Sequence, residues 1–332
     1  MLSVFGARPS RTVLWLLTVG MLLALVRFDG FWSRAIQRNA ASLDFLRTIR
    51  SGNNAGVCQG LEATGQHDRV VPILPRGNQR IDILSGLLAL ARGDAPQAKL
   101  VLSQVLANGI GRPTDQLWLG CAAFRAGEPP LAITAWREAG ALDYFILRGY
   151  DALVRRDEAT ALTLYQIAAQ IEPDSAEAWL GIAFARQHLA LRGQAQWEDM
   201  LQAAERALAL APEEPRAHYL VGYALWYLKR DPERTERELR WALEHRDDWL
   251  DAYALGRFLL DQGRAGEPTQ LIQRALFMQD IPMVRVQMVR AYLSEGRCAD
   301  AQREYAIAVQ RFPGLEEDLL AICRAYPVCP CR

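Results

Sequence analysis

The chain has 332 residues, of which 51% are hydrophobic and 23% are charged. This composition is ordinary for a folded protein, and it excludes both wholesale disorder and a membrane protein with many spans. Lysine plus arginine and aspartate plus glutamate are equal at 38 each. The chain therefore lacks the overall positive field that collects nucleic acid, and we expect no nucleic-acid partner.

The first element is a run of uncharged, mostly apolar residues, 12–26, between Arg11 and Arg27. As a helix it is roughly 22 Å long, shorter than a ~30 Å hydrocarbon core, but Arg27 can extend toward the interface. We predict a membrane anchor within residues 1–32, with Val13, Leu14, Trp15, Leu16, Leu17, Leu22, Leu23 and Leu25 in the bilayer. A cleaved signal peptide and a buried helix of a soluble protein remain alternatives, although no small-x-small cleavage site follows the apolar run.

Basic residues do not decide on which side of the membrane the rest of the chain lies. Arg8 and Arg11 precede the apolar run, whereas Arg27, Arg34 and Arg38 follow it, and this count slightly favours a cytoplasmic body. A long domain can be translocated regardless of such counts, and a lone N-terminal apolar helix commonly serves to export the domain behind it. We therefore predict an extracytoplasmic body, with the cytoplasmic side as the alternative.

Residues 33–78 connect the anchor to the rest of the chain. Residues 33–50 have helical apolar periodicity, and frequent glycine and proline then interrupt any regular element. We predict a juxtamembrane helix followed by loops.

From residue 79 a pattern of two helices joined by a turn recurs along the chain. One unit contains Phe145, Gly149, Ala152, Ala161, Tyr165, Ala168 and Pro173, and another contains Met288, Tyr292, Gly296, Ala301, Tyr305, Ala308 and Pro313. Units starting at residues 79, 113, 142, 176, 215, 249 and 282 are separated by 34, 29, 34, 39, 34 and 33 residues. The second unit is therefore short and the fourth is long.

This pattern resembles the tetratricopeptide repeat, a helix-turn-helix unit of 34 residues, over residues 79–314. Within each unit, small residues at positions eight, twenty and twenty-seven allow the helices to approach closely. An aromatic residue near position twenty-four fills the remaining space between them. A proline ends the second helix. The predicted fold is all-α, a right-handed superhelical solenoid of about seven repeats. Within residues 315–332, an amphipathic helix at 315–326 is predicted to cap the last repeat.

Cysteines lie mainly at the C-terminal end. We predict that Cys121 is a small core residue. A disulfide among Cys298, Cys323, Cys329 and Cys331 is plausible if the body is exported, with free thiols and a metal site as the alternatives.

The resemblance implies that the first helix of each repeat lines a concave groove. The residues that it places there are Phe184, His188, Tyr219, Tyr223, Trp226, Tyr227, Tyr253, Arg257 and Arg290. Tyrosine, tryptophan and arginine dominate binding hot spots, which favours a groove for a peptide or helix of a partner protein. The alternative is that some of these rings pack between repeats. Family members that bind the C-terminal carboxylate of a peptide use lysine and asparagine at two of these positions. This chain has other residues there, so that kind of binding is disfavoured.

The sequence contains no zinc-protease helix, no phosphate-binding loop and no nucleophile elbow. We therefore predict no enzymatic activity, no cofactor and no metal. The main hypothesis is a membrane-tethered scaffold that assembles or stabilises a protein complex. The alternative is an accessory subunit of a cell-envelope polysaccharide enzyme, in which the aromatic groove contacts glycan.

Overall fold

The computed structural model describes residue 58, residues 79–109 and residues 113–329. All regular elements in these ranges are helices. The chain divides into two compact units, Met1–Gly140 and Ala141–Arg332. None of the described helices is both long enough and apolar enough to cross a membrane. The predicted anchor within residues 1–32 and most of the predicted connection over residues 33–78 lie outside the described residues.

The first unit contains two pairs of helices. They are α2 (Gln79–Ala91), α3 (Ala95–Ala107), α4 (Pro113–Arg125) and α5 (Pro129–Glu138). Each helix packs on the next one, and α2 also contacts α4.

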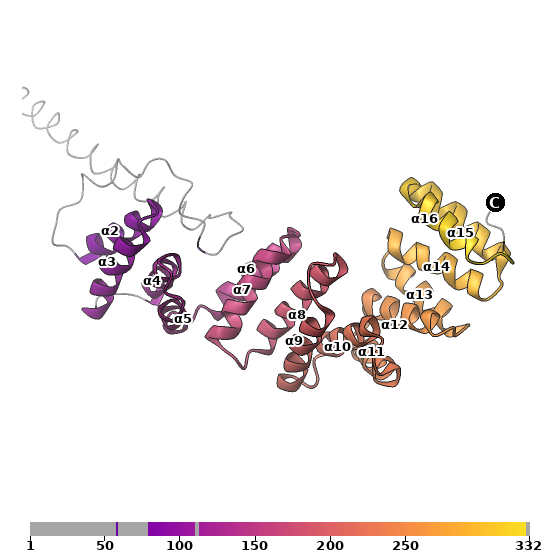
Figure 1. The fold of residues 1–332 in the computed structure, drawn as a ribbon, viewed down its shortest axis with the longest axis horizontal. Helices are drawn as coiled ribbons and strands as arrows, with labels where there is room; N and C mark the ends of the chain where they lie inside the picture. Colours follow the sequence, from indigo (N-terminus) through magenta and orange to yellow (C-terminus); the bar gives the residue numbers. More distant parts are fainter. Residues whose placement is uncertain (1–57, 59–78, 110–112, 330–332) are drawn as a thin grey trace, which may run out of the picture. The chain divides into compact units, whose positions relative to one another are not determined.

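The second unit continues the same arrangement with five pairs and a final helix among its described residues (Figure 1). The pairs are α6 (Leu142–Val154) with α7 (Glu158–Ile171), α8 (Ala176–Leu191) with α9 (Trp197–Leu210), α10 (Pro215–Leu228) with α11 (Pro232–His245), α12 (Trp249–Asp261) with α13 (Glu267–Met278), and α14 (Pro282–Ser294) with α15 (Cys298–Arg311). The first helices also contact one another in series, from α6 to α8, α10, α12 and α14. The starts of all the first helices, from α2 to α14, coincide with the unit starts predicted from the sequence.

Glycines in the first helices allow the second helices to pack closely. A Cβ atom added to Gly149 of α6 would lie 2.8 Å from the Tyr165 ring, and one added to Gly181 of α8 would lie 2.2 Å from it. The Tyr165 ring of α7 therefore fits between two helix backbones. The same relation holds in the first unit, where a Cβ atom on Gly120 would lie 2.3 Å from the Trp136 indole nitrogen.

The turn inside each helix pair has a common backbone form. One residue takes a positive φ and donates its N–H to the carbonyl three residues earlier, and the next residue donates to the carbonyl five residues earlier. This conformation favours glycine. Glycine occupies it in five turns, as Gly93, Gly127, Gly193, Gly263 and Gly296. Arg156 (φ 62°) and Lys229 (φ 53°) occupy it in the other two described turns.

A short helix covers the end of the second unit. The predicted capping helix at 315–326 is α16 (Glu316–Arg324), which follows a single 3-10 turn, η4 (Pro313–Leu315). Leu319 of α16 is fully buried in a cluster that includes Val289 and Leu293 of α14. The end of the stack is thus covered by apolar side chains of a non-repeat helix.

Each unit contains a disulfide that joins two of its own residues. Cys298, the first residue of α15, is bonded to Cys329 beyond α16, and Cys323 is also disulfide-bonded. Cys331 lies outside the described residues. Cys121 is buried in the core, as predicted, but it is also bonded to Cys58, which was not predicted. The guanidinium of Arg125 also donates a hydrogen bond to the Cys58 carbonyl, so α4 holds this residue at two points.

Candidate protein-binding site

The predicted groove residues lie on four first helices of the second unit. Phe184 and His188 lie on α8; Tyr219, Tyr223, Trp226 and Tyr227 lie on α10; Tyr253 and Arg257 lie on α12; and Arg290 lies on α14. Because these helices contact one another in series, the residues lie on adjacent elements, although they are far apart in the sequence.

Three of these residues are buried and do not form a ligand surface. Tyr219, Tyr223 and Tyr253 are only 1%, 4% and 2% exposed. The Tyr219 hydroxyl accepts a hydrogen bond of 2.8 Å from the Gln187 amide of α8. Burial raises the pKa of both Tyr219 and Tyr223 well above the usual value for tyrosine. Their prediction as groove residues is therefore corrected: these rings pack α10 and α12 against their neighbours.

The partly exposed residues form a smaller group, here called the aromatic cluster, of Trp197, Trp226, Tyr227 and Arg257. The Trp197 ring at the start of α9 stacks on the Tyr227 ring, with 4.2 Å between centroids and 23° between planes. The Arg257 guanidinium lies 4.8 Å from the Trp226 ring centroid and donates to the Tyr227 hydroxyl at 3.2 Å. Ring stacking and cation–π contact therefore fix the geometry of this cluster before any partner binds.

Trp197 was missed by the sequence reasoning. It begins a second helix, and the repeat register places only first-helix residues in the groove. The signal that could have found it is the extra length of the fourth unit. That length is divided between α8, which has 16 residues where the other first helices have 13 or 14, and the turn 192–196 that leads into Trp197.

Beside the aromatic cluster lies a cavity of about 430 Å³, formed where α10 turns into α11 and bounded by α12. The residues that line it are Leu225, Trp226, Lys229, Arg230, Pro232, Thr235, Phe258, Asp261, Gln262 and Arg290. Leu225, Thr235 and Phe258 are buried and form its inner wall. The cavity is in the size range of pockets that hold small ligands or a few side chains.

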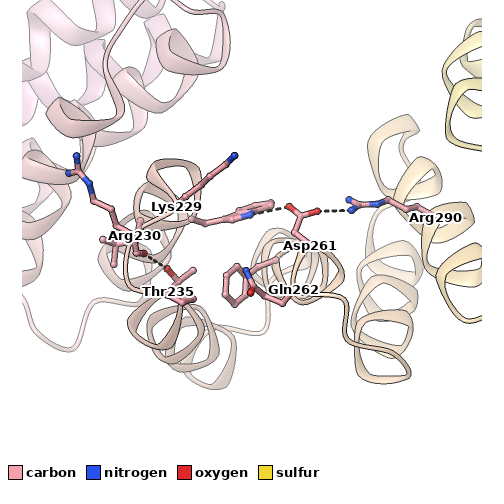
Figure 2. Close-up of a pocket in the computed structure, with 10 residues that line it drawn as sticks. Lys229, Arg230, Thr235, Asp261, Gln262 and Arg290 are labelled. Carbon is pink, nitrogen blue, oxygen red and sulfur yellow. Dashed lines mark hydrogen bonds and ion pairs between the residues drawn. The ribbon is translucent and has the colours of Figure 1, made fainter. Parts of the chain in front are cut away.

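One carboxylate organises the outer part of the cavity. Asp261 accepts a hydrogen bond of 3.1 Å from the Trp226 indole nitrogen and pairs with the Arg290 guanidinium at 2.7 Å. Figure 2 shows Asp261 and Arg290 pointing toward each other, whereas Arg230 points away from them. Arg230 instead pairs with Glu198 at 3.0 Å. Trp226 and Arg290, both predicted from the sequence, thus meet through an aspartate that was not predicted.

The remaining predicted residues, Phe184 and His188, lie outside this cavity. The Phe184 ring is partly buried and stacks at 6.5 Å on the Tyr219 ring, and His188 is exposed near the end of α8. In the parts of the chain that the structure describes, no three His, Cys, Asp or Glu side chains are grouped so that they could hold a metal ion.

Comparison of the fold with solved structures gives neighbours that are helical repeat proteins of low sequence identity. TTC0263, a tetratricopeptide protein of Thermus thermophilus, is 20% identical over 55% of this chain and 98% of its own, with a TM-score of 0.45. PilW, a type IV pilus biogenesis factor, is 19% identical over 56% of this chain and 84% of its own, with a TM-score of 0.48.

A third solved structure is YrrB, described as a tetratricopeptide protein with an unusual peptide-binding site. It is 18% identical over 58% of this chain and 98% of its own, with a TM-score of 0.42. No family model and no curated protein matches the sequence.

Proposed function

We propose that this chain is a non-enzymatic tetratricopeptide-type scaffold that binds a segment of a partner protein at the aromatic cluster and the adjacent cavity. The observation that carries the proposal is the meeting of Trp226, Tyr227, Arg257 and Arg290 beside an open cavity on successive first helices. Aromatic and arginine side chains that are already fixed by their neighbours lose little conformational entropy on binding, which is typical of protein-binding hot spots.

A glycan-binding role has less support. Sugar rings stack on the open faces of aromatic side chains, but the Tyr227 face is covered by Trp197 and Arg257 lies over the Trp226 ring. The cavity instead offers apolar side chains beside charged groups, a combination that suits a peptide segment. We therefore retain the protein partner and place the polysaccharide enzyme second.

The membrane tether is part of this proposal. The apolar run at residues 12–26 would hold the scaffold at a bilayer, so that it assembles or stabilises a membrane-associated complex. The disulfides of both units support an extracytoplasmic body, because disulfides form and persist mainly in oxidising compartments.

Site-specific crosslinking tests the binding surface. A photoreactive benzoylphenylalanine placed at Gln262, an exposed residue that lines the cavity, is expected to capture a partner protein in native membranes. The matched control is the same residue at Arg237, which is exposed on α11 and does not line the cavity. No product at position 262, or the same product at both positions, would contradict the proposed surface.

Fractionation tests the tether separately. The full chain is expected to remain in membranes after extraction with alkaline carbonate, whereas a chain lacking residues 1–32 is expected to be released. Alkylation of intact cells before and after reduction reports the compartment, because oxidised cysteines are labelled only after reduction. Release of the full chain by carbonate, or complete labelling without reductant, would overturn these parts of the proposal.

A further inference from the structure

Among the charged residues that line the cavity, Lys229 is set apart by its lack of an ion pair. Asp261 is engaged by the Trp226 indole and by Arg290, and Arg230 is paired with Glu198. Within the described residues, Lys229 makes no ion pair or hydrogen bond through its side chain, and it is exposed at the cavity mouth. In Figure 2 no dashed line reaches the Lys229 amine. The cavity therefore presents one uncompensated positive charge.

The backbone at Lys229 adds an independent observation. Lys229 has a φ of 53° at the turn position that five other helix pairs fill with glycine. A residue with a Cβ is disfavoured in this region relative to glycine. The chain thus carries a lysine where its own repeats show that glycine fits, and it does so at the turn that lines the cavity.

The other residues that line the cavity around Lys229 are mostly apolar or already hydrogen-bonded. Leu225 and Phe258 are buried and apolar, and Pro232 adds an apolar rim. The Thr235 hydroxyl donates to the Asp231 carbonyl at 3.0 Å, so it does not make the inner wall polar. The side-chain amide of Gln262 is exposed and makes no hydrogen bond within the described residues, so it can bond to a peptide backbone.

We propose that the cavity binds an acidic segment of the partner protein, with an aspartate or glutamate side chain paired to Lys229 and a neighbouring apolar side chain on the more accessible Pro232 and Trp226. This inference rests on the proposed protein-binding function and specifies the chemistry of the partner. An acidic ligand fits better than a basic one, because the carboxylate of Asp261 is already held by two donors while the Lys229 amine is not. A hydrogen bond between the charged Lys229 amine and a carboxylate is stronger than a bond between neutral groups.

Selection of peptides on the purified full chain tests the inference. A phage-displayed library of random dodecapeptides is expected to yield sequences in which an acidic residue neighbours an apolar one. Each selected peptide is then synthesised with an amidated C-terminus, so that only side-chain carboxylates can account for binding. Replacement of its acidic residue by glutamine is expected to weaken binding about five- to tenfold, measured by fluorescence anisotropy, with no such loss at acidic positions outside the motif.

Variants of Lys229 separate charge from backbone conformation. Lys229→Arg is expected to retain binding, whereas Lys229→Gln and Lys229→Gly are expected to lose about the same five- to tenfold. Lys229→Gly removes the strained side chain, so its thermal midpoint is expected to equal or exceed that of the parent, and its loss of binding does not reflect unfolding. Arg156→Gly makes the same change at a turn that does not line the cavity, and it is expected to leave peptide affinity unchanged.

Charge reversal provides the decisive comparison. Lys229→Glu is expected to prefer the peptide in which the acidic residue is replaced by lysine. Unchanged affinity in the Lys229→Gln variant, or selection of basic peptides, would overturn this inference while leaving the protein-binding function intact. If the library yields no binder and Gln262 gives no crosslink, the proposed function itself fails.

Discussion

Substitution of Gly181 by alanine tests the packing on which the repeat stack depends. The added Cβ would lie 2.2 Å from two carbon atoms of the Tyr165 ring, far inside a normal carbon–carbon contact of ~3.5–4.0 Å. The ring cannot move away freely, because a Cβ on Gly149 would lie only 2.8 Å from its other end, so the α6 backbone is close on that side. The overlap must therefore be relieved by displacing a helix.

Two opposing contributions set the size of the effect. Overpacking a well-packed core costs roughly 1–3 kcal/mol, and occasionally more, and the severe overlap at Gly181 places it in the upper part of that range. Replacing glycine by alanine inside a helix stabilises it by about 1 kcal/mol. The difference is a net loss of about 2 kcal/mol in the free energy of unfolding.

Urea denaturation followed by circular dichroism measures this loss, with Gly314→Ala as the matched control. A Cβ on Gly314 would meet nothing within 4 Å, so we expect a change below about 0.5 kcal/mol there. The double variant Gly181→Ala, Tyr165→Leu should lose less than the sum of its parts, because leucine vacates the contested space. A Gly181→Ala protein as stable as the parent or more stable would refute the packing described here, because helix propensity alone predicts that result.

Three further variants probe other interactions. Arg246→Met leaves the fully buried Asp251 carboxylate without the guanidinium that bonds it at 2.7 and 2.8 Å. We expect a loss of ~3–5 kcal/mol in the free energy of unfolding, measured by urea denaturation, and a large recovery when Asp251→Leu is added. Equal stability of the single and the double variant would contradict this expectation. The hydrogen bond from Arg285 lowers the pKa of Asp280 in the folded protein. The stabilisation that this carboxylate contributes is therefore fully present above its unfolded pKa of about 4 and is lost as the pH falls toward the lower, folded pKa. The difference in stability between the parent and Asp280→Asn should narrow as the pH is lowered from 7, and a constant difference would count against the assignment. Cys298→Ser removes a disulfide that joins residues 31 apart in the sequence. The stability of the last repeat should fall by about 3–4 kcal/mol, and the segment after α16 should become sensitive to limited proteolysis. An unchanged cleavage pattern would show that apolar contacts alone hold this segment.

The helix pairs could be predicted from the sequence because closely packed helices need small residues at regularly spaced positions. Gly149 was identified as a small position, and the structure places it against the aromatic residue of the same unit. Gly181 was not singled out, because its need for a small side chain comes from Tyr165 of the preceding unit. A periodic pattern thus shows contacts inside a repeat more readily than contacts across a boundary between repeats.

The candidate site was predictable only in part. Tyr219, Tyr223, Trp226 and Tyr227 all lie on α10, but the spacing of residues along one helix does not tell which of them are covered by the neighbouring helices. Asp261 and Lys229 were missed for another reason. Their role comes from the meeting of a helix end and a turn in different repeats, which the spacing of residues along one helix does not encode. The Cys58–Cys121 bond, with 63 residues between its partners, is likewise invisible to local patterns.

The bond between Cys298 and Cys329 means that two kinds of interaction, covalent and non-covalent, close the last repeat. Apolar contacts place α16 over α14 and bury Cys329, and the disulfide adds a covalent link between the chain beyond α16 and the start of α15. In a reducing environment the segment just after α16 would be attached to the last repeat by non-covalent contacts alone, so it would open at a lower free-energy cost. The redox state of its surroundings would therefore set how firmly this last repeat is held closed.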